Sequence, residues 1–244
     1  MAKILVCDTE CNSLDTENGV IQELAWIIWD SEKKRAIKAQ SALIRWDKEY
    51  ETTVEAIRIN GLKREYTEKF GISPGMIFNP FLNDLAQVEY ICGHNILGYD
   101  LPMLISNLER FKDSYSVLIK KVPVIDTMLD CPFPEGMRIS SLKYLALDHN
   151  YILMNAHNAL SDVMACAHLL GYYDFETILQ ISKTPVVKMQ SKVEFTDIER
   201  REKLKGQRFY WNKEQKLWER KIRQWYVSGV QLELGFNVSM QKEF

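Results

Sequence analysis

Residues 4–10, which read ILVCDTE, constrain this chain more than any other stretch. Four apolar residues lead directly to Asp8, and Glu10 follows two positions later. A short continuous apolar run predicts a buried strand, and because side chains alternate along a strand, both acids point to the same face. Two carboxylates held side by side repel and raise each other's pKa unless a cation lies between them. The stretch therefore predicts a strand end that binds a metal ion.

The composition is that of an ordinary globular protein, with 244 residues, of which 46% are hydrophobic and 26% charged. That length allows one core of typical domain size with a small appendage. The sequence shows neither the apolar core of a signal peptide nor a run long enough for a membrane span, so we expect a cytoplasmic, intracellular protein. Its five cysteines are odd in number, scattered and without a CxxC pair, which favours reduced thiols over disulfides or a zinc site.

Charge is distributed unevenly along the chain. Residues 1–182 carry 17 Lys and Arg against 25 Asp and Glu, whereas residues 183–223 carry 13 against 6. A basic segment joined to an acidic one can supply phosphate affinity that the acidic part lacks. A solvated basic face without a ligand explains the same charge equally well.

The first 180 residues predict an α/β fold in which helices cover a mixed sheet. Strands are expected at residues 4–10, 20–30 and 36–44, joined by short turns into an antiparallel meander. Two short helices around Gly61, a loop at 71–76, a helix at 81–88 and a strand at 90–92 come next. An amphipathic helix is expected at 101–111, a strand at 122–125, and helices over 142–147 and 158–170.

Residues beyond 180 differ in composition from the rest. The polar stretch 181–200, broken by Pro185, is predicted to be a linker. Residues 208–222 place two aromatic-rich runs around a polar five-residue turn, the pattern of a β-hairpin, and residues 225–238 could add a strand. The predicted organisation is a main domain over 1–180, a linker over 181–200 and a small, basic, aromatic β-rich extension over 201–244.

Acids recur in three separated segments. After the DTE of the first strand, the segment GHNILGYD places Asp100 at the start of a helix, and HNALSD places His157 before a helix with Asp162 in its first turns. Taken singly, Asp100 and Asp162 have an alternative explanation as acids at the positive end of a helix dipole. A lone histidine is more often a surface or packed residue than a catalyst. The pair on the first strand has no such explanation.

In this order the segments DxE, HNxxxYD and HxAxxD resemble the three exonuclease motifs of the DEDD superfamily of 3′-to-5′ exonucleases, in its histidine-bearing DEDDh branch. That branch includes polymerase proofreading subunits, enzymes resembling exonuclease X and the ribonuclease T group. The resemblance spans residues 3–180 and includes IQELA at 21–25, IDT at 125–127 and SLKYL at 141–145. It implies an RNase H-like fold, with three antiparallel strands followed by parallel ones.

The resemblance also implies a site of four carboxylates and one histidine. Asp8, Glu10 and Asp162 would hold one divalent ion, and a second would lie between Asp8 and the scissile phosphate, with Asp100 reaching it directly or through water. His157 would lie on the loop before its helix and act as general base on the attacking water. Two ions about 3.5–4 Å apart can stabilise the entering and leaving oxygens of a phosphodiester displacement. Oxygen ligands without a thiol favour Mg²⁺ or Mn²⁺ over zinc.

Around this site the resemblance assigns substrate contacts to Thr9, Leu14, Asn95 and Tyr99. Thr9 would contact the terminal 3′ nucleotide and Leu14 would wedge against the last bases, although DTECNSL departs here from the DxExTGL of relatives. Asn95 is expected to hold its loop or to contact substrate. Structural roles are expected for Asp126 as the cap of a turn, for Glu23 as a pairing residue within the sheet, and for His94, His149 and His168.

The extension mixes aromatic rings with basic side chains, a combination that proteins use to bind single strands. Its candidate nucleic-acid contacts are Arg208, Tyr210, Trp211, Trp218 and Arg220. The alternative is that these rings cover a face of the main domain. A homodimer, or a protein partner bound by the extension, is left open.

Together these features predict a metal-dependent 3′-to-5′ exonuclease that releases nucleoside monophosphates. Single-stranded DNA is favoured over RNA, because the overall pattern is closer to exonuclease X-like enzymes than to ribonuclease T. The alternatives are an exoribonuclease of the same fold and a non-catalytic module that binds nucleic acid or a polymerase. A non-catalytic module would be recognised by a missing carboxylate, and none is missing.

Overall fold

The computed structural model describes residues 2–47, 49–134 and 136–242 and has an α/β fold. The chain divides into two compact units, one of residues 1–133 and 137–175 and the other of residues 134–136 and 176–244. Within the described ranges, no helix has both the length and the apolar character needed to cross a membrane.

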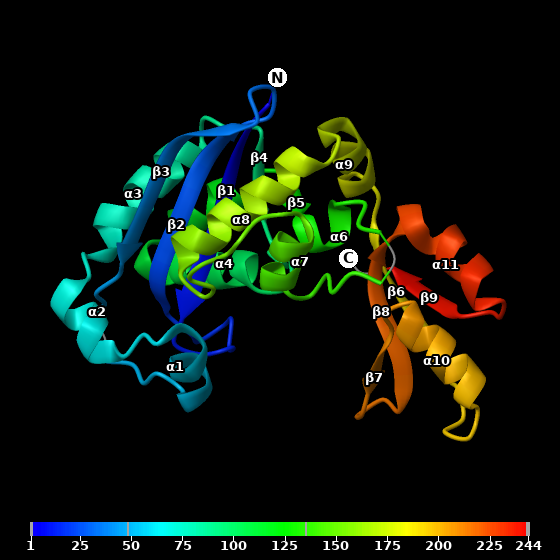
Figure 1. Ribbon diagram of the computed structural model, residues 1–244. Helices are drawn as coiled ribbons and strands as arrows, with labels where there is room; N and C mark the ends of the chain where they lie inside the picture. The colour runs from blue at the N-terminus through cyan, green and yellow to red at the C-terminus, as the bar shows by residue number, and fades with distance from the viewer. Residues whose placement is uncertain (1, 48, 135, 243–244) are drawn as a thin grey trace. The chain divides into compact units, whose positions relative to one another are not determined.

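The first unit is built on a five-stranded mixed sheet in the order β3-β2-β1-β4-β5. Its strands are β1 (Lys3–Cys11), β2 (Ile21–Asp30), β3 (Arg35–Leu43), β4 (Tyr90–Gly93) and β5 (Val124–Asp126). β1 pairs antiparallel with β2 and parallel with β4, and β4 pairs parallel with β5 (Figure 1). The predicted arrangement of three antiparallel strands followed by parallel ones is confirmed.

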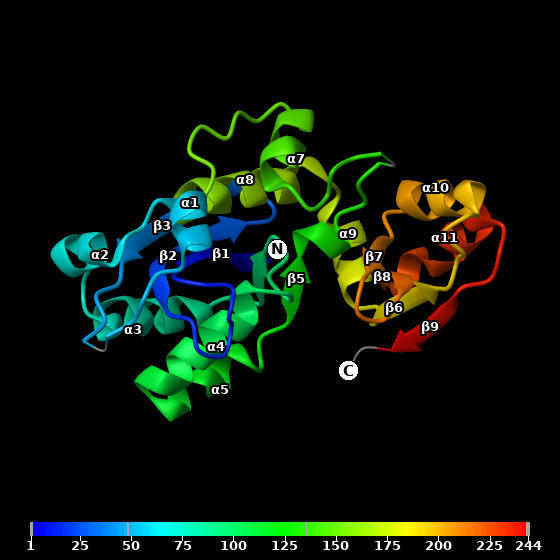
Figure 2. The same cartoon turned by 90° about the horizontal axis from the view of Figure 1, so that it is seen from below.

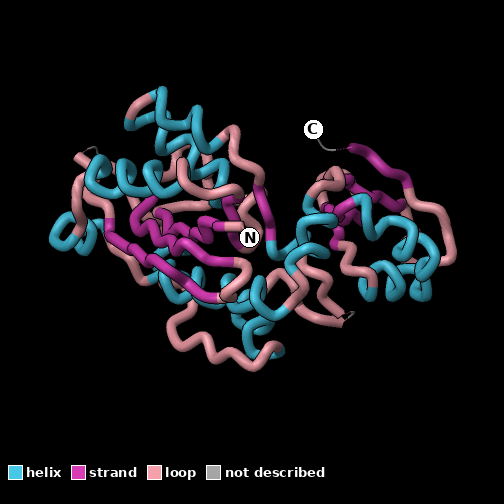
Figure 3. Tube along the Cα trace, turned by 90° about the horizontal axis from the view of Figure 1, so that it is seen from above, coloured by secondary structure: helices cyan, strands magenta, loops and turns pink. Residues whose placement is uncertain are grey.

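Helices cover both faces of this sheet (Figures 2 and 3). On one face, α8 (Ala159–Tyr172) packs along β1 and β2. On the other, α3 (Pro74–Leu85) and α4 (Asp100–Phe111) bury Phe78 and Leu104 in one cluster with Leu5 and Cys7 of β1. The remaining helical segments of this unit are α1 (Val54–Asn60), α2 (Arg64–Phe70), η1 (Asp113–Tyr115), α5 (Ser116–Ile119), α6 (Thr127–Asp130) and α7 (Leu142–Asp148).

Helix α3 begins earlier than predicted, so the expected loop over 71–76 is wrong in its second half. Ser73 occupies the N-cap position and Pro74 lies in the first turn, where a missing backbone N–H costs no hydrogen bond. Ile77, Phe78 and Phe81 are then buried at helical spacing. The apolar face that these residues form outweighs the turn signal of the adjacent Pro and Gly.

The second unit folds as a βαββαβ series, the succession found in ferredoxin-like domains. After α9 (Phe175–Ser182) come β6 (Val186–Ser191), α10 (Ile198–Gly206), β7 (Tyr210–Asn212), β8 (Leu217–Arg223), η2 (Gln224–Tyr226), α11 (Val227–Leu234) and β9 (Ser239–Lys242). The four strands are antiparallel throughout and lie in the order β7-β8-β6-β9.

Strand β6 lies inside the stretch 181–200 that was predicted to be a linker, and it is one of the two central strands of this second sheet. Val187 and Met189 alternate with polar neighbours and are buried with Trp218 and Ile222 of β8. Pro185 directly precedes the strand, a position that requires no ladder hydrogen bond from proline. Because only two of the buried side chains of β6 are apolar, the strand has the polar composition of a linker.

The predicted β-hairpin is present, since β7 and β8 pair antiparallel with Asn212 opposite Leu217. The strand expected over 225–238 is wrong, because this stretch contains α11. Val227, Val230 and Leu234 are buried at helical spacing, and Gly235 ends the helix with a left-handed φ of 68°. The extension is therefore mixed α/β and not simply β-rich.

Candidate active site

The carboxyl end of β1 carries the first pair of acids. Because Leu5 and Cys7 pack with α3 and α4, Asp8 and Glu10 lie on the face that α8 covers. Glu10 is directly opposite Glu23 of β2, and a β-bulge follows Glu10. A bulge re-aims the end of a strand. Asp8 and Glu10 line the same cavity, as their spacing predicts.

Asp100 is brought to this strand end by Thr9, which lies between the two acids. Asp100 is the first residue of α4, and its Oδ1 accepts a hydrogen bond from the backbone N–H of Thr9 at 3.0 Å and another from the Thr9 hydroxyl at 2.7 Å. Sequence reasoning assigned Thr9 to the substrate and missed this contact, for which the motif spacing carries no signal. The side chain of Thr9 therefore orients a carboxylate of the site.

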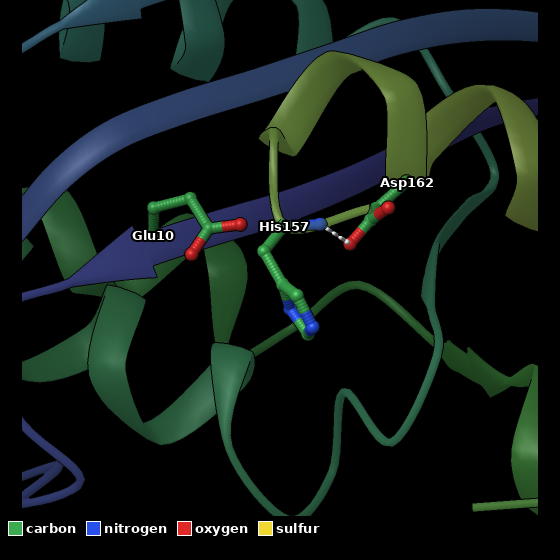
Figure 4. A group of neighbouring side chains, drawn as sticks. All are labelled: Glu10, His157 and Asp162. Carbon is green, nitrogen blue, oxygen red and sulfur yellow. Dashed lines mark hydrogen bonds between the residues drawn. The ribbon is translucent and has the colours of Figure 1, made fainter. Parts of the chain in front are cut away.

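His157 lies on the loop before α8, where the sequence predicts it. Its backbone has a left-handed φ of 66°, unusual for a residue with a side chain. Its N–H donates a hydrogen bond to Oδ2 of Asp162, which lies in the first turn of α8, at 3.2 Å. Figure 4 shows this bond and the His157 ring between the carboxylates of Glu10 and Asp162. The loop and the helix thus present their functional groups together.

A partly buried chain of hydrogen bonds connects this loop to the sheet. Asn158 is the N-cap of α8, and its Oδ1 accepts from the N–H of Ser161 at 3.2 Å. Its Nδ2 donates to Oε1 of Glu23 at 3.2 Å, and Glu23 also accepts from the hydroxyl of Ser41 on β3 at 2.9 Å. The sequence predicts only the pairing of Glu23 within the sheet. The structure shows that the same carboxylate holds the residue next to His157.

The carboxylates fit a divalent cation. Glu10, His157 and Asp162 form a group whose metal-binding atoms all lie within 4.8 Å of one another. Oδ1 of Asp162 is buried and has no hydrogen-bond partner among the described residues. Leaving a buried acceptor unsatisfied costs about 1–3 kcal/mol, and a cation would satisfy it. Asp8 lies outside this group of three but lines the same cavity.

All four acids titrate above their ordinary range. Burial, reinforced by Asp100 and Asp162, raises the pKa of Asp8 well above its usual value. Burial and the neighbouring Asp162 raise the pKa of Glu10 to about 9. Burial also raises the pKa of Asp100 to about 6, although the hydrogen bonds from Thr9 oppose the shift, and that of Asp162 to about 6. Glu10 and Asp100 are buried, and Asp8 and Asp162 are half-buried. Four neighbouring acids that resist ionisation favour a cation as their partner.

The predicted substrate residues line the same cavity as the acids. The cavity has a volume of about 210 Å³, and its lining includes Asp8, Glu10, Asp100, His157, Asp162, Thr9, Leu14, Asn95 and Tyr99. Leu14 is 75% exposed, so its side chain is available at the rim. The sequence motifs do not predict one wall of the cavity. This wall is formed by α1 and its N-cap, through Thr53, Glu55, Ala56, Ile59 and Asn60. The N-cap at Thr53 signals this helix, but no spacing connects it with the motifs.

The loop between β4 and α4 is held by Asp126. Its carboxylate accepts from the N–H of Asn95 at 2.9 Å and of Leu97 at 3.2 Å, and it caps α6 by accepting from the N–H of Met128 at 3.0 Å. Asn95 has a left-handed φ of 59°. The hydroxyl of Tyr99 donates to the carbonyl of Ser13 at 2.8 Å, which ties this loop to the one after β1. The structural role predicted for Asp126 agrees with these contacts.

The other three histidines make contacts within the fold. Nδ1 of His94 lies 3.0 Å from the Thr127 hydroxyl, and burial lowers the pKa of His94 to about 4. Nε2 of His149 lies 2.5 Å from the Tyr173 hydroxyl, and Nε2 of His168 lies 2.8 Å from the carbonyl of His149. His94 also lines the cavity. All five cysteines are buried as free thiols.

The candidate contacts in the second unit differ in their accessibility. Trp218 is only 7% exposed and belongs to the core of this unit, so it offers no face on which a base could stack. Arg208 donates to the carbonyl of Pro134 and Arg220 to that of Gln207. Tyr210 and Trp211 are 51% and 43% exposed. The two exposed rings remain candidates for a nucleic-acid contact.

Comparison with known proteins identifies a family and a fold. Residues 5–170 match the RNase T family model, whose description is exonuclease. This match confirms the resemblance predicted from the three motifs. No curated protein matches the chain.

Solved structures of exonuclease I are similar in fold. The E. coli enzyme in complex with a dA16 oligonucleotide aligns with a TM-score of 0.61 and 15% identity, over 78% of this chain and 48% of that one. Its zinc-bound complex with single-stranded DNA gives 0.61 and 14%, with the same coverage. Exonuclease I in its apo form gives 0.59 and 14%, over 78% of this chain and 50% of that one. This chain thus spans about half the length of those proteins, and at such identity the likeness establishes the fold alone.

Proposed function

Because the chain belongs to the RNase T family of exonucleases, we propose that it removes nucleoside monophosphates one at a time from the 3′ end of a nucleic-acid strand. The observation that carries the proposal is the convergence of Asp8, Glu10, Asp100, Asp162 and His157, from three separate segments, on one cavity. Hydrolysis of a phosphodiester needs a group that accepts a proton from water and a means of stabilising negative charge. This set of side chains supports both requirements.

Asp8, Glu10 and Asp162 would hold Mg²⁺ or Mn²⁺, and Asp100 would complete the set for two ions. When bound, such ions stabilise charge on the entering and leaving oxygens of the phosphodiester. The carboxylate oxygens suit hard divalent cations. Asp8 and Glu10 are placed by the buried strand β1, while Thr9 fixes the carboxylate of Asp100 and the His157 N–H fixes that of Asp162. A rigid set of ligands holds the substrate phosphate in one orientation.

His157 would accept the proton of the water that attacks the phosphorus atom. Histidine changes its protonation state near neutral pH, which suits a general base. The ring nitrogen belongs to the same 4.8 Å group as carboxylate oxygens of Glu10 and Asp162. The proton taken up at that nitrogen would then pass to solvent. The left-handed backbone at His157 and the cap at Asn158 keep the ring on this side of the cavity.

We propose single-stranded DNA as the preferred substrate. Structures of E. coli exonuclease I, which this chain resembles in fold, were solved with dA16 and dT13 oligonucleotides. A shared fold supports a shared substrate only by analogy. Matched DNA and RNA oligonucleotides, with single-stranded DNA degraded fastest, would test this choice.

The test of the proposed reaction uses single strands labelled at either end. With Mg²⁺, a 3′ label should be released at once as a mononucleotide, whereas a 5′ label should appear in a ladder of shortening products. Asp162→Asn should reduce this release to background, because it removes a charged ligand atom from the cavity. Asp148→Asn, the same change at an exposed position on α7, should not.

The opposite labelling pattern would show 5′-to-3′ degradation and contradict the proposed direction. Products longer than mononucleotides would contradict exonucleolytic cleavage. Strands left intact under all conditions, but still bound, would favour the alternative of a non-catalytic nucleic-acid-binding module.

A further inference from the structure

The sheet of the second unit has two chemically different faces. Partner residues in register share a face, because side chains alternate along each strand. Val187 and Met189 of β6 and Ile222 of β8 are buried in one cluster with Leu204 of α10 and Val230 of α11. Both helices of the βαββαβ series therefore pack on this first face, as Figure 1 shows.

The residues between these apolar positions form the second face, which we call the polar sheet face. The register places Lys188 directly opposite Lys221, Gln190 opposite Glu219, and Tyr210 opposite Glu219. The polar sheet face consists of Val186, Lys188, Gln190, Tyr210, Asn212, Leu217, Glu219, Lys221, Arg223, Ser239 and Gln241. It holds three basic side chains, one acid, and amide and hydroxyl groups, with one aromatic ring.

The one acid of this face is committed to internal hydrogen bonds. Glu219 is 4% exposed and accepts from the hydroxyl of Tyr210 at 2.8 Å and from Nδ2 of Asn212 at 3.1 Å, both at Oε1. Gln190 donates to its other oxygen at 3.4 Å. These bonds and the charge of Lys188 lower the pKa of Glu219 against the effect of burial. Arg223 is buried and donates to the carbonyl of Thr184. The positive charge that this face presents to its surroundings therefore comes from Lys221, which is exposed, and Lys188, which is partly exposed.

Tyr210 is held in place as well as exposed. The residue is 51% exposed, and the bond to Glu219 fixes the direction of its hydroxyl. A ring whose orientation is already set loses little conformational entropy when a base stacks on it. Stacking on aromatic side chains contributes about 1–3 kcal/mol per base in proteins that bind single strands.

We propose that the polar sheet face binds single-stranded nucleic acid, with Lys188 and Lys221 contacting phosphates and Tyr210 stacking on a base. Charge complementarity favours this occupant over a protein. Four-stranded sheets in RNA-recognition modules bind single strands in the same manner. The choice of ligand rests on the proposed exonuclease function.

A nucleic-acid-binding surface on the second unit would compensate for the net negative charge of the first unit. By sequence, the first unit contains 17 Lys and Arg against 23 Asp and Glu, and the second contains 14 against 10. An acidic unit repels a polyanion outside its metal site, whereas the basic unit on the same chain would raise the local concentration of strand. The second unit is thus proposed to bind strands, and the first to cleave them.

The test measures binding separately from cleavage. The full-length chain is titrated, in EDTA, into a fluorescent oligothymidylate at several salt concentrations. The variant Lys188→Gln/Lys221→Gln should weaken binding about tenfold and reduce the slope of log K against log salt by about 1.4, or 0.7 for each of two phosphate contacts. Lys203→Gln/Lys205→Gln on α10 makes the same charge change in the same unit and serves as the control. This control should change binding much less.

The ring is tested on its own by Tyr210→Ala and Tyr210→Phe. Loss of the ring should weaken binding about fivefold or more, and the phenylalanine variant, which keeps the ring, should retain most of the affinity. Thermal unfolding of every variant checks that the unit remains folded.

Equal loss of affinity in the two lysine variants would overturn the proposal, because binding would then be a diffuse effect of charge. Unchanged affinity in both would also overturn it and would leave a protein as the occupant of this face. Failure of the exonuclease proposal looks different, since the strand would still bind in EDTA and remain intact with Mg²⁺.

Discussion

Three consecutive residues of β1 perform different tasks because side chains alternate across a strand. Asp8 and Glu10 line the cavity from the face that α8 covers, whereas Thr9 donates to Asp100 from the other side of the strand. The motif predicts the acids from their spacing. It does not predict the contact of Thr9, since this residue lies 91 positions from Asp100. A contact of Thr9 with the terminal nucleotide stays a prediction.

Replacing Thr9 separates these two roles. Thr9→Val keeps the backbone bond to Asp100 but removes the hydroxyl bond, and a hydrogen bond to a charged group contributes about 1.5–3 kcal/mol. We expect kcat for mononucleotide release to fall at least about tenfold with little change in KM. Thr9→Ser keeps the hydroxyl and should restore most of the rate. A rise in KM without a change in kcat would instead indicate that Thr9 contacts the substrate.

The loop that precedes α8 is the element on which the general base depends. Asn158 joins it to the helix by capping α8 and to the sheet by its bond to Glu23. The helix itself is predicted from its apolar spacing, and His157 is predicted to lie on this loop. The link to Glu23 joins residues 135 positions apart and becomes visible only when strand and helix are packed together.

Two substitutions at Asn158 distinguish the cap from the link. Asn158→Ala removes both and should lower the free energy of unfolding by about 1 kcal/mol, the usual contribution of an N-cap. Asn158→Asp keeps a capping oxygen but places a carboxylate against Glu23, so repulsion should displace the loop of His157. We expect the Asn158→Asp variant to be more stable than the Asn158→Ala variant but to have a lower kcat than the unsubstituted protein. Full activity in the Asp variant would show that the link does not position His157.

The start of α3, strand β6 and helices α10 and α11 were predicted with the wrong type or extent. Turn residues at the start of α3, and polar composition in β6 and α10, outweighed a short apolar pattern. In α11, Val227, Val230 and Leu234 have helical spacing, but only the packing of α11 against the second sheet distinguishes it from a weakly alternating strand. Short elements contain too few buried positions for their hydrophobic periodicity to distinguish a helix from a strand.

For the whole molecule, the concentrated acids of the first unit make stability depend on pH and metal. Carboxyl groups with raised pKa bind more protons in the folded than in the unfolded state between the two pKa values. The contribution of these acids to stability is therefore greatest at low pH and falls as pH rises through the folded values, about 6 for Asp100 and Asp162 and about 9 for Glu10. A bound cation would offset this loss.

Thermal unfolding with and without Mg²⁺ measures this linkage. In EDTA, the melting temperature should be lower near pH 8 than near pH 6, and Mg²⁺ should raise it more at the higher pH, because binding to the folded state alone stabilises it. Glu10→Gln removes the acid with the pKa of about 9 and should reduce both effects. A melting temperature that rises with pH in EDTA, or that does not change when Mg²⁺ is added, would contradict the cation site.

Part of this structure is encoded in short-range sequence patterns. The buried strand that ends in Asp8 and Glu10, the helices that begin at Asp100 and before Asp162, and the mixed sheet of the first unit follow from local periodicity and motif order. The partners of these residues, namely Thr9 for Asp100 and Glu23 for Asn158, follow from packing in three dimensions. The same is true of the pairing of β6 with β8 that creates the polar sheet face. Local preferences fix how a segment folds, whereas contacts between distant segments depend on the packing of the whole core.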